Sequence, residues 1–414
     1  MRRSSWKGWP AVLAALVCAG QFPAHAEGVE FRPEATLKEI YLDNVLFLGE
    51  TENDNKKSDL VTEVALFLPL IRESSSGKMA LSYTPSYQKY QDAENLDHDE
   101  HRLRFDLKTS RSPVSRSELS AALSRTWTSS NPGDLDAMNL FLSSLKERDL
   151  ADLQFRYRRD LRDNWQSEFR VRGKTYDYEV VGGAPQDAED RDEVSGTLGL
   201  SKYLAPVTRV GIEYEYRRFD YEVSGGQNVN LVSLGLAHRT GRDTTLRFQL
   251  GGFQVDNRND DSSVRDETDS GFSGELSLDR EIASTALRVF AKRTPSSAAP
   301  FTGVRNTTSI GLAWSALPGP RVDWNVSARY GLRSSDATDP NQPDQGGGSD
   351  LTSVSLGAGF ERRWRDSMGL RAAAVFRDQS GSDDPARNDS VFTGRVAFVW
   401  YPRGTGWSED EVAR

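Results

Sequence analysis

The chain lacks, or nearly lacks, three features on which common structural and catalytic sites depend. It has a single cysteine, Cys18, so no disulfide can form within the chain. It has only four histidines, three of which lie after residue 26: His98, His101 and His238. After residue 26 it also has no run of 18 apolar residues, the length that a membrane-spanning helix needs. Disulfide frameworks, histidine-based metal sites and helical membrane proteins are therefore disfavoured.

Positive net charge is also missing, because the formal net charge is −9 and the pI is about 5.2. Nucleic acid is therefore not expected as the main partner.

The amino terminus differs from the rest. It has a basic start, an apolar stretch at 11–19 and a small-x-small site at Ala24-His25-Ala26. This pattern predicts a cleaved secretory signal over 1–26, with the mature chain starting near Glu27.

What the chain does have is alternation of apolar with small or polar residues. In the segment 306–333, Ile310, Leu312 and Trp314 alternate with glycine, alanine and serine, and a turn at 317–320 joins this run to a second one. Side chains on a strand point to opposite faces with a period of two, so each run has one apolar face. Runs of about ten residues are long enough to cross a bilayer at a tilt. The pattern recurs in eighteen candidate strands: 37–47, 58–70, 78–88, 101–109, 115–127, 150–159, 165–176, 192–204, 209–219, 228–238, 244–255, 270–282, 285–293, 306–316, 321–332, 351–362, 367–377 and 390–400.

The segments between these runs alternate in length. Short turns such as 205–208 and 283–284 alternate with longer polar loops such as 128–149 and 334–350, and only 223–227 is shorter than expected for its place. Short periplasmic turns and long outer loops are typical of outer-membrane barrels. The prediction is an all-β fold, a closed antiparallel transmembrane β-barrel of about 18 strands (16–18). A soluble β-sandwich or β-solenoid is the alternative, because alternation alone allows it.

Charged residues occupy the face opposite the apolar one. Charge in lipid is costly, so these residues are expected to line the lumen. A wide cationic lumen would attract anionic solutes; alternatively, the carboxylates Asp106, Glu168, Glu213 and Glu215 neutralise the arginines and no solute passes. Arg288, Lys292, Arg377 and Arg395 extend the basic set on later strands. The predicted pore-lining residues are Arg102, Arg104, Lys108, Arg156, Arg158, Arg170, Arg172, Lys174, Arg217, Arg247, Arg329 and Arg371.

The loops have the opposite charge and offer a second place for function. Acidic groups fall at 94–100, 187–192 and 256–269, and their oxygens suit calcium, which could bridge to lipopolysaccharide phosphates. None fits an EF-hand, so they are taken as solvated loop surface and no metal site is predicted. In 131–148, apolar residues at helical spacing predict a short amphipathic helix that constricts the lumen, caps the barrel mouth or packs among the loops outside.

Signals for catalysis are sparse. His98-Asp-Glu-His101 lacks the spacing of a zinc-binding helix and is expected in an exposed loop, and His238 falls at a strand end. No G-x-S-x-G elbow is present. The chain is therefore predicted not to be an enzyme and to need no cofactor, with an outer-membrane hydrolase kept as a remote alternative.

The amino-terminal part of the mature chain resembles a known family. The segments 39–45 (EIYLDNV) and 57–60 (KSDL), together with Leu81, Tyr83, Tyr87 and Tyr90, resemble the start of outer-membrane β-barrel porins encoded beside exopolysaccharide-synthesis and export genes in Gram-negative bacteria. The resemblance implies a role in moving or anchoring a surface polysaccharide, with periplasmic export components as partners, and it implies no catalytic residues.

These observations together predict four regions. They are a signal peptide (1–26), a short periplasmic segment (27–36), the barrel (37–401) and a periplasmic tail (402–414). The predicted function is a passive outer-membrane channel for an exopolysaccharide or another anionic solute. The alternative is a non-conducting barrel that anchors a polysaccharide assembly or binds ligand through its acidic loops. Outer-membrane lipid, lipopolysaccharide and the barrel-insertion machinery are the other expected partners.

Overall fold

Antiparallel strands make up almost all of the structure. The computed structural model describes residues 29–43, 58–127, 146–180, 190–222, 225–258, 268–297, 304–319, 321–334, 351–365, 367–381 and 389–400. Two short 3₁₀ turns, η2 (Glu94–Leu96) and η4 (Arg162–Asn164), accompany the strands. The strands are β1 (Val29–Phe31), β2 (Glu34–Leu42), β3 (Asp59–Ser74), β4 (Gly77–Tyr90), β5 (His98–Ser112), β6 (Ser115–Trp127), β7 (Lys146–Asp160), β8 (Trp165–Val180), β9 (Arg191–Ala205), β10 (Thr208–Tyr221), β11 (Gly225–Thr240), β12 (Thr244–Arg258), β13 (Thr268–Ile282), β14 (Thr285–Ser297), β15 (Val304–Gly319), β16 (Val322–Ser334), β17 (Leu351–Arg365), β18 (Met368–Gly381) and β19 (Asp389–Trp400).

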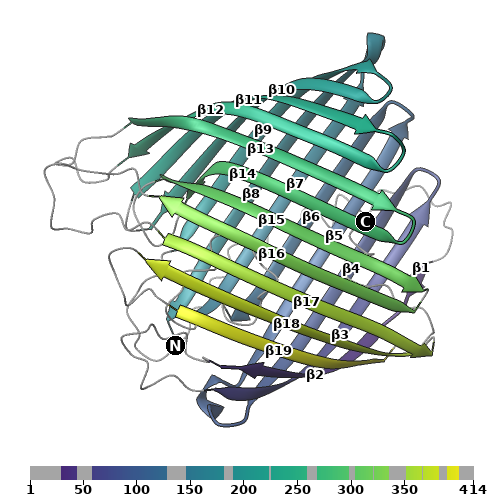
Figure 1. Ribbon diagram of the computed structural model, residues 1–414, viewed down its shortest axis with the longest axis vertical. Helices are drawn as coiled ribbons and strands as arrows, with labels where there is room; N and C mark the ends of the chain where they lie inside the picture. Colours follow the sequence, from purple (N-terminus) through teal and green to yellow (C-terminus); the bar gives the residue numbers. More distant parts are fainter. Residues whose placement is uncertain are drawn as a thin grey trace, which may run out of the picture.

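Strands β2 to β19 form a closed ring of eighteen (Figure 1). Each strand pairs antiparallel with the next one in the chain, and the ring closes where β19 pairs with β2 from Trp400↔Ala35 to Thr393↔Leu42. Closure leaves no sheet edge with unpaired backbone groups. The predicted closed antiparallel barrel and its strand number are confirmed.

The additional strand, β1, extends the line of β2 along β3. β1 pairs with β3 through Val29↔Arg72 and Phe31↔Leu70, whereas β2 pairs with the part of β3 that ends at Phe67. Between β1 and β2 lies Pro33, which has no backbone N–H to donate to the ladder. Strand structure therefore begins inside the segment 27–36, which the sequence placed before the barrel.

The two ends of the barrel differ in how the strands are joined. At one end, which we call the short-turn end, tight turns join β3 to β4, β9 to β10 and the other pairs of the same kind. The turn between β11 and β12 contains Gly241 at φ +76°, a left-handed conformation that glycine adopts without strain. At the opposite, long-loop end the connections are longer, except between β10 and β11, as the sequence indicated.

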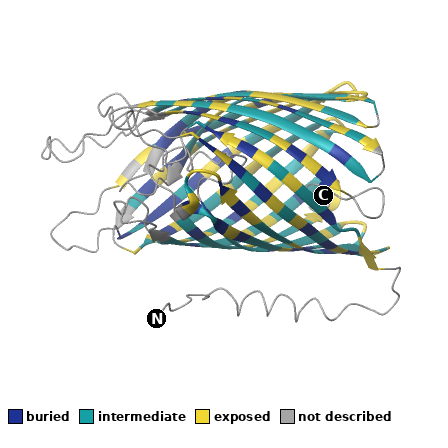
Figure 2. Cartoon of the chain, turned by 90° about the horizontal axis from the view of Figure 1, so that it is seen from below, coloured by how far each residue is buried: buried dark blue, intermediate teal, exposed yellow. Residues whose placement is uncertain are grey.

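The wall has an apolar outer face and a polar inner face. On β10, Ile212 and Tyr214 are 49% and 41% exposed and alternate with Glu213 and Glu215. Figure 2 shows the same alternation of exposed and buried positions along many strands. Exposed aromatic residues occur on the outer face near both ends: Trp324, Trp364 and Trp400 near the short turns, and Tyr41, Tyr87 and Phe392 near the long loops. Such aromatic bands flank the apolar belt of barrels that sit in a bilayer.

The segment 93–100 differs from the sequence prediction, which placed His98 in an exposed loop. His98 begins β5 and is only 6% exposed, with its ring stacked on Trp127 at 4.4 Å between centroids. Beside it, Leu96 packs in a buried apolar cluster with Ile40, Leu42, Val61, Tyr90 and Trp127. The prediction was wrong because the connection between β4 and β5 folds inward onto this cluster.

Hydrogen bonds to carboxylates hold this connection in place. Asp59 accepts hydrogen bonds from the backbone N–H groups of Gln91, Asp92 and Ala93 at 3.0–3.1 Å. Asp97 accepts one from the backbone N–H of Tyr90 at 2.7 Å. Asp97, which the sequence placed on a solvated loop surface, therefore has a structural role here.

Other predictions fall outside the described residues, in whole or in part. The signal peptide, the tail 402–414 and residues 131–145 of the predicted amphipathic helix lie outside them. Lys146 and Arg148, the expected end of that helix, instead belong to β7. Among the described residues, no helix has the length and apolarity needed to cross a membrane.

Candidate functional site

The barrel encloses a cavity of about 590 Å³ that is bounded by side chains from both sides of the ring. Its lining runs from Gln154 on β7 to Arg329 on β16. β8 and β16 are eight places apart in a ring of eighteen strands, so they lie on nearly opposite walls. Residues from both walls can bound one cavity only if the cavity lies inside the ring.

Cationic side chains reach this cavity from both walls. Arg170, Arg172 and Lys174 come from alternate positions of β8, and Arg217 comes from β10. Lys292 on β14 and Arg329 on β16 approach from the other side. Acidic residues line the same cavity: Glu193, Glu213, Glu215 and Glu275. The cavity is therefore highly charged, with both signs present.

A smaller cavity of about 210 Å³ continues along the same wall. Glu213, Gln249 and Glu275 line both cavities, which makes the two neighbours. Arg209 and Arg247 provide the cationic side chains of the smaller one. The lining of the larger cavity extends from β7 to β16, and that of the smaller cavity from β8 to β13.

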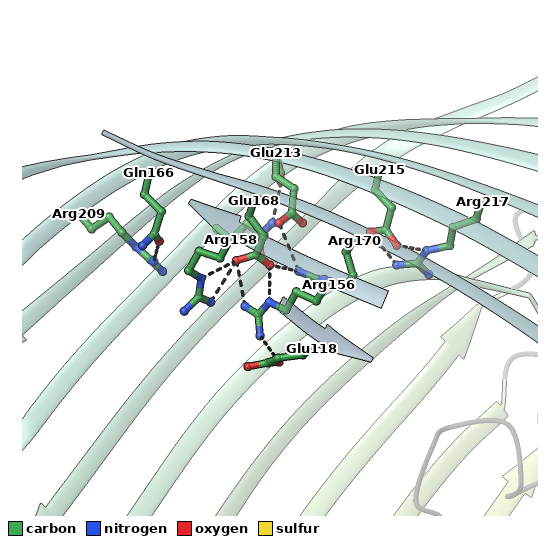
Figure 3. Close-up of polar contacts among 12 residues, drawn as sticks. Glu118, Arg156, Arg158, Gln166, Glu168, Arg170, Arg209, Glu213, Glu215 and Arg217 are labelled. Carbon is green, nitrogen blue, oxygen red and sulfur yellow. Dashed lines mark hydrogen bonds and ion pairs between the residues drawn. The ribbon is translucent and has the colours of Figure 1, made fainter. Parts of the chain in front are cut away.

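Glu168, which lines the smaller cavity, binds three arginines (Figure 3). Its carboxylate accepts hydrogen bonds from Arg156 at 2.9 and 3.0 Å, from Arg158 at 3.1 and 3.3 Å, and from Arg170 at 3.0 Å. Arg156 and Arg170 face each other directly across β7 and β8, where two like charges repel. Glu168 sits beside both and offsets that repulsion. We call these four residues the Glu168 cluster.

Most of the remaining inner-face arginines also contact a carboxylate. Arg172 binds Asp152 at 2.5 Å, and Arg217 binds Glu215 at 2.6 Å. Arg104 binds Asp106 at 2.7 Å, Arg102 binds Glu100 at 3.2 Å, Arg371 binds Glu361 and Glu34 at 3.0 and 3.1 Å, and Arg247 binds Asp279. The pairing that the sequence analysis kept as an alternative is therefore present along much of the wall.

Paired charges on the inner face nevertheless stay in contact with the lumen. The side chains of Arg247, Arg288 and Lys292 are 52%, 53% and 48% exposed. Lys174 donates to the hydroxyl of Tyr176 at 3.2 Å, and no carboxylate among the described residues forms an ion pair with it. Solvated cations of this kind can still attract an anion that enters the lumen.

The predicted pore-lining residues divide into three groups. Five of them, Arg170, Arg172, Lys174, Arg217 and Arg329, line the larger cavity. Arg247 lines the smaller one. The others line neither cavity: Arg102, Arg104, Lys108, Arg156, Arg158 and Arg371.

The uncharged polar residues of the larger cavity were not predicted from the sequence. Ser195 and Thr197 on β9, Gln249 on β12, and Thr307 and Ser309 on β15 supply hydroxyl and amide groups between the charged ones. The signal that could have identified them is positional, because they alternate with apolar residues in the same way as the charged residues do.

An eighteen-stranded closed barrel with an apolar outer face and a charged inner face is a transmembrane β-barrel. Comparison with protein families and with curated proteins finds no match to this chain.

Solved barrels do share its general shape. OccAB4 of Acinetobacter baumannii is 10% identical, with a TM-score of 0.47 over 92% of this chain and 99% of that one. OccK2 of Pseudomonas aeruginosa, solved in complex with glucuronate, is 10% identical with a TM-score of 0.47 over 90% and 98%. OpdK of Pseudomonas aeruginosa, solved with vanillate, is 12% identical with a TM-score of 0.46 over 90% and 98%.

Proposed function

We propose that the protein is an outer-membrane channel that passively conducts anionic solutes through its lumen. The observation that carries the proposal is the 590 Å³ cavity, which lies inside the closed ring and has cationic side chains on both walls. A solute that moves along the barrel passes between Lys174 and Arg217 on one side and Lys292 and Arg329 on the other. We therefore expect this part of the lumen to favour anions over cations.

Ion pairing within the wall is compatible with such a path. Carboxylates such as Asp152 and Glu215 hold arginine side chains in fixed positions while part of each guanidinium still lines the cavity. An anion that arrives can then exchange contacts with an array that is already in place, which lowers the ordering cost of binding. The selectivity that results is moderate and falls with ionic strength, because salt screens exposed charges.

The polysaccharide part of the proposal rests on two supports. The first is the resemblance of segments 39–45 and 57–60 to barrel proteins encoded beside exopolysaccharide genes. The second is the set of hydroxyl and amide side chains between the charges, represented by Thr197, Gln249 and Ser309, which suit the hydroxyl groups of a sugar. An acidic sugar polymer carries both of the groups that this lining recognises.

In this proposal the short-turn end faces the periplasm and the long-loop end faces outward, as in other outer-membrane barrels. Cleavage near Glu27 and insertion by the barrel-assembly machinery precede function. Lipopolysaccharide surrounds the outer half of the barrel, and periplasmic export components meet the short-turn end.

The Glu168 cluster favours one competing function, a non-conducting barrel that anchors a surface assembly. Three arginines held by one carboxylate stiffen the wall, and the contacts with Glu168 occupy part of each guanidinium group. That reading requires the lumen to be closed to sugars, so permeation of sugars distinguishes the two functions.

Liposome swelling with charged and neutral sugars tests the proposal. Purified barrel in liposomes should admit oligomers of a uronic acid faster than neutral oligomers of equal length, because the lining favours anions. The double variant K174A/K292A should lose much of that difference, whereas K38A, a variant of an inner-face lysine that binds Glu63 and lines neither cavity, should keep it. Swelling that is absent for every sugar would support the anchoring function instead.

A further inference from the structure

Five basic side chains form a band around the outer face of the barrel at the short-turn end. Each lies within three residues of the end of its strand and has the same period of two as the exposed apolar residues of that strand. On β7, for example, Arg159 follows the exposed residues Leu153 and Phe155 at this spacing and therefore faces outward. We call the five residues the basic band: Arg72 on β3, Arg159 on β7, Lys202 on β9, Arg280 on β13 and Arg362 on β17.

The described part of the chain supplies no counter-charge to the basic band. None of the five forms an ion pair with a carboxylate there, and no outward-facing position within three residues of the short-turn end is aspartate or glutamate. On the inner face, by contrast, Arg172 and Arg217 bind carboxylates. Outward-facing carboxylates lie at the long-loop end, where Asp99, Asp149 and Asp220 each contact a basic side chain. The outer face is therefore positively charged at the short-turn end.

Two residues of the basic band flank the short-turn end of β8. Arg159 lies directly opposite Ser167, and Lys202 lies directly opposite Trp165. Ser167 and Trp165 are two residues apart on β8, so the two cations border one short stretch of a single strand. Lys202 Nζ lies 5.2 Å from the centre of the Trp165 ring, a cation–π contact that positions the ammonium group and leaves its charge in place. We call these four residues the β7–β9 site.

The basic band lies close to the aromatic residues of the short-turn end. Trp364 follows Arg362 by two residues on β17, and the exposed residues Trp324 and Trp400 lie near other short turns. Aromatic side chains of this kind sit at the level of the lipid headgroups. Long basic side chains there keep their methylene groups on apolar surface and extend their charged ends toward the headgroups. A lipid phosphate is the group of opposite charge that this level of a bilayer provides.

We propose that the basic band binds anionic phospholipids of the leaflet at the short-turn end, with its main contact at the β7–β9 site. The headgroup phosphate accepts hydrogen bonds from the guanidinium of Arg159 and the ammonium of Lys202. The acyl chains lie on Phe155, Phe169 and Leu198, exposed outer-face residues of the same three strands. A lipid fits better than a protein partner, because the charges adjoin the apolar surface that the bilayer covers. The binding is independent of conduction, since no residue of the basic band lines either cavity of the lumen.

Native mass spectrometry of the detergent-solubilised full chain tests the proposal with two lipids of identical acyl chains. Phosphatidylglycerol has a net negative charge, whereas phosphatidylcholine has the same phosphate and a cationic choline that neutralises it. The wild-type barrel should retain phosphatidylglycerol better, and R159Q/K202Q should reduce that retention by about fivefold, the effect of two partly exposed charges. The matched control K89Q/R218Q removes one lysine and one arginine from the outer face near the long-loop end and should leave retention unchanged.

Equal retention of the two lipids by the wild-type barrel would overturn the proposal without any variant. So would retention of phosphatidylglycerol that R159Q/K202Q leaves unchanged or that K89Q/R218Q lowers equally, with folding of each variant checked by heat-modifiable gel migration. Displacement of the lipid by sodium phosphate, but not by sodium chloride of the same ionic strength, would assign the β7–β9 site to a free anion and would also overturn it. R159Q/K202Q should keep the sugar preference in liposome swelling, so this proposal and the proposed channel can fail separately.

Discussion

Glu168 holds three arginine side chains together on the inner face. It accepts hydrogen bonds from Arg156, Arg158 and Arg170, and its own side chain is only 18% exposed. The variant Glu168→Gln removes the charge that offsets the repulsion between Arg156 and Arg170. We expect the free energy of unfolding, measured by urea titration in detergent micelles, to fall by about 1–3 kcal/mol.

The same variant should also make the channel more selective for anions, because three arginines lose their counter-charge in one step. Glu118→Gln is the matched control, since Glu118 also lies near Arg156, but at 3.9 Å, and its side chain is 47% exposed. It should leave stability and selectivity close to those of the wild type. A Glu168→Gln barrel with unchanged stability would show that the cluster holds nothing in place.

At the level of single residues, the sequence allowed prediction of the face a charge occupies but not of its partner. Arg170 and Arg172 were assigned to one face because they alternate with Phe169 and Val171. Arg170 binds Glu168 two residues earlier on β8, whereas Arg172 binds Asp152 on β7, and this second pairing depends on the register between the two strands. A shift of register by one residue reverses every side chain, and alternation alone does not determine it.

Among the elements, the connection between β4 and β5 is where local structure depends most on a single side chain. The variant Asp59→Ala removes the acceptor for the backbone N–H groups of Asp92 and Ala93. Their amide hydrogens should exchange with solvent at least about tenfold faster, because each loses a charge-assisted hydrogen bond. Hydrogen exchange followed by mass spectrometry over residues 91–97 measures this.

Asp43→Ala provides the comparison for that experiment. Asp43 also accepts a backbone hydrogen bond through its carboxylate, from Phe392 at 2.7 Å, at a more exposed site. Its loss should affect exchange near Phe392 and leave residues 91–97 as they are. Unchanged exchange at Asp92 and Ala93 in Asp59→Ala would contradict the role given to Asp59.

The strands could be predicted from the sequence, whereas the inward-folded connection between β4 and β5 could not. Every one of the eighteen alternating runs corresponds to a barrel strand, since burial against lipid on one face and water on the other imposes a period of two. The site of His98 has no such periodic signal. Its burial depends on contacts with Trp127 on β6 and on the cluster around Val61, which are distant in the sequence.

At the scale of the whole molecule, closure of the sheet places one face of all eighteen strands inside the barrel and the other face outside it. The pairing of β19 with β2 could be inferred from the need to leave no edge, and the structure shows it from Trp400 to Thr393. The shape of the lumen could not be inferred in this way. Strand tilt and barrel curvature determine which side chains from opposite walls bound one cavity. Neither can be predicted from the sequence of a single strand.

The most direct test of an anion-conducting lumen is the reversal potential of single channels in a planar bilayer under a KCl gradient. Cations on both walls predict a potential with the sign of chloride selectivity. Its magnitude should fall as the mean salt concentration rises past about 0.1–1 M, where the screening length shrinks to a few ångströms. A reversal potential with the sign of potassium selectivity, or the absence of any channel current from folded barrel, would contradict the account.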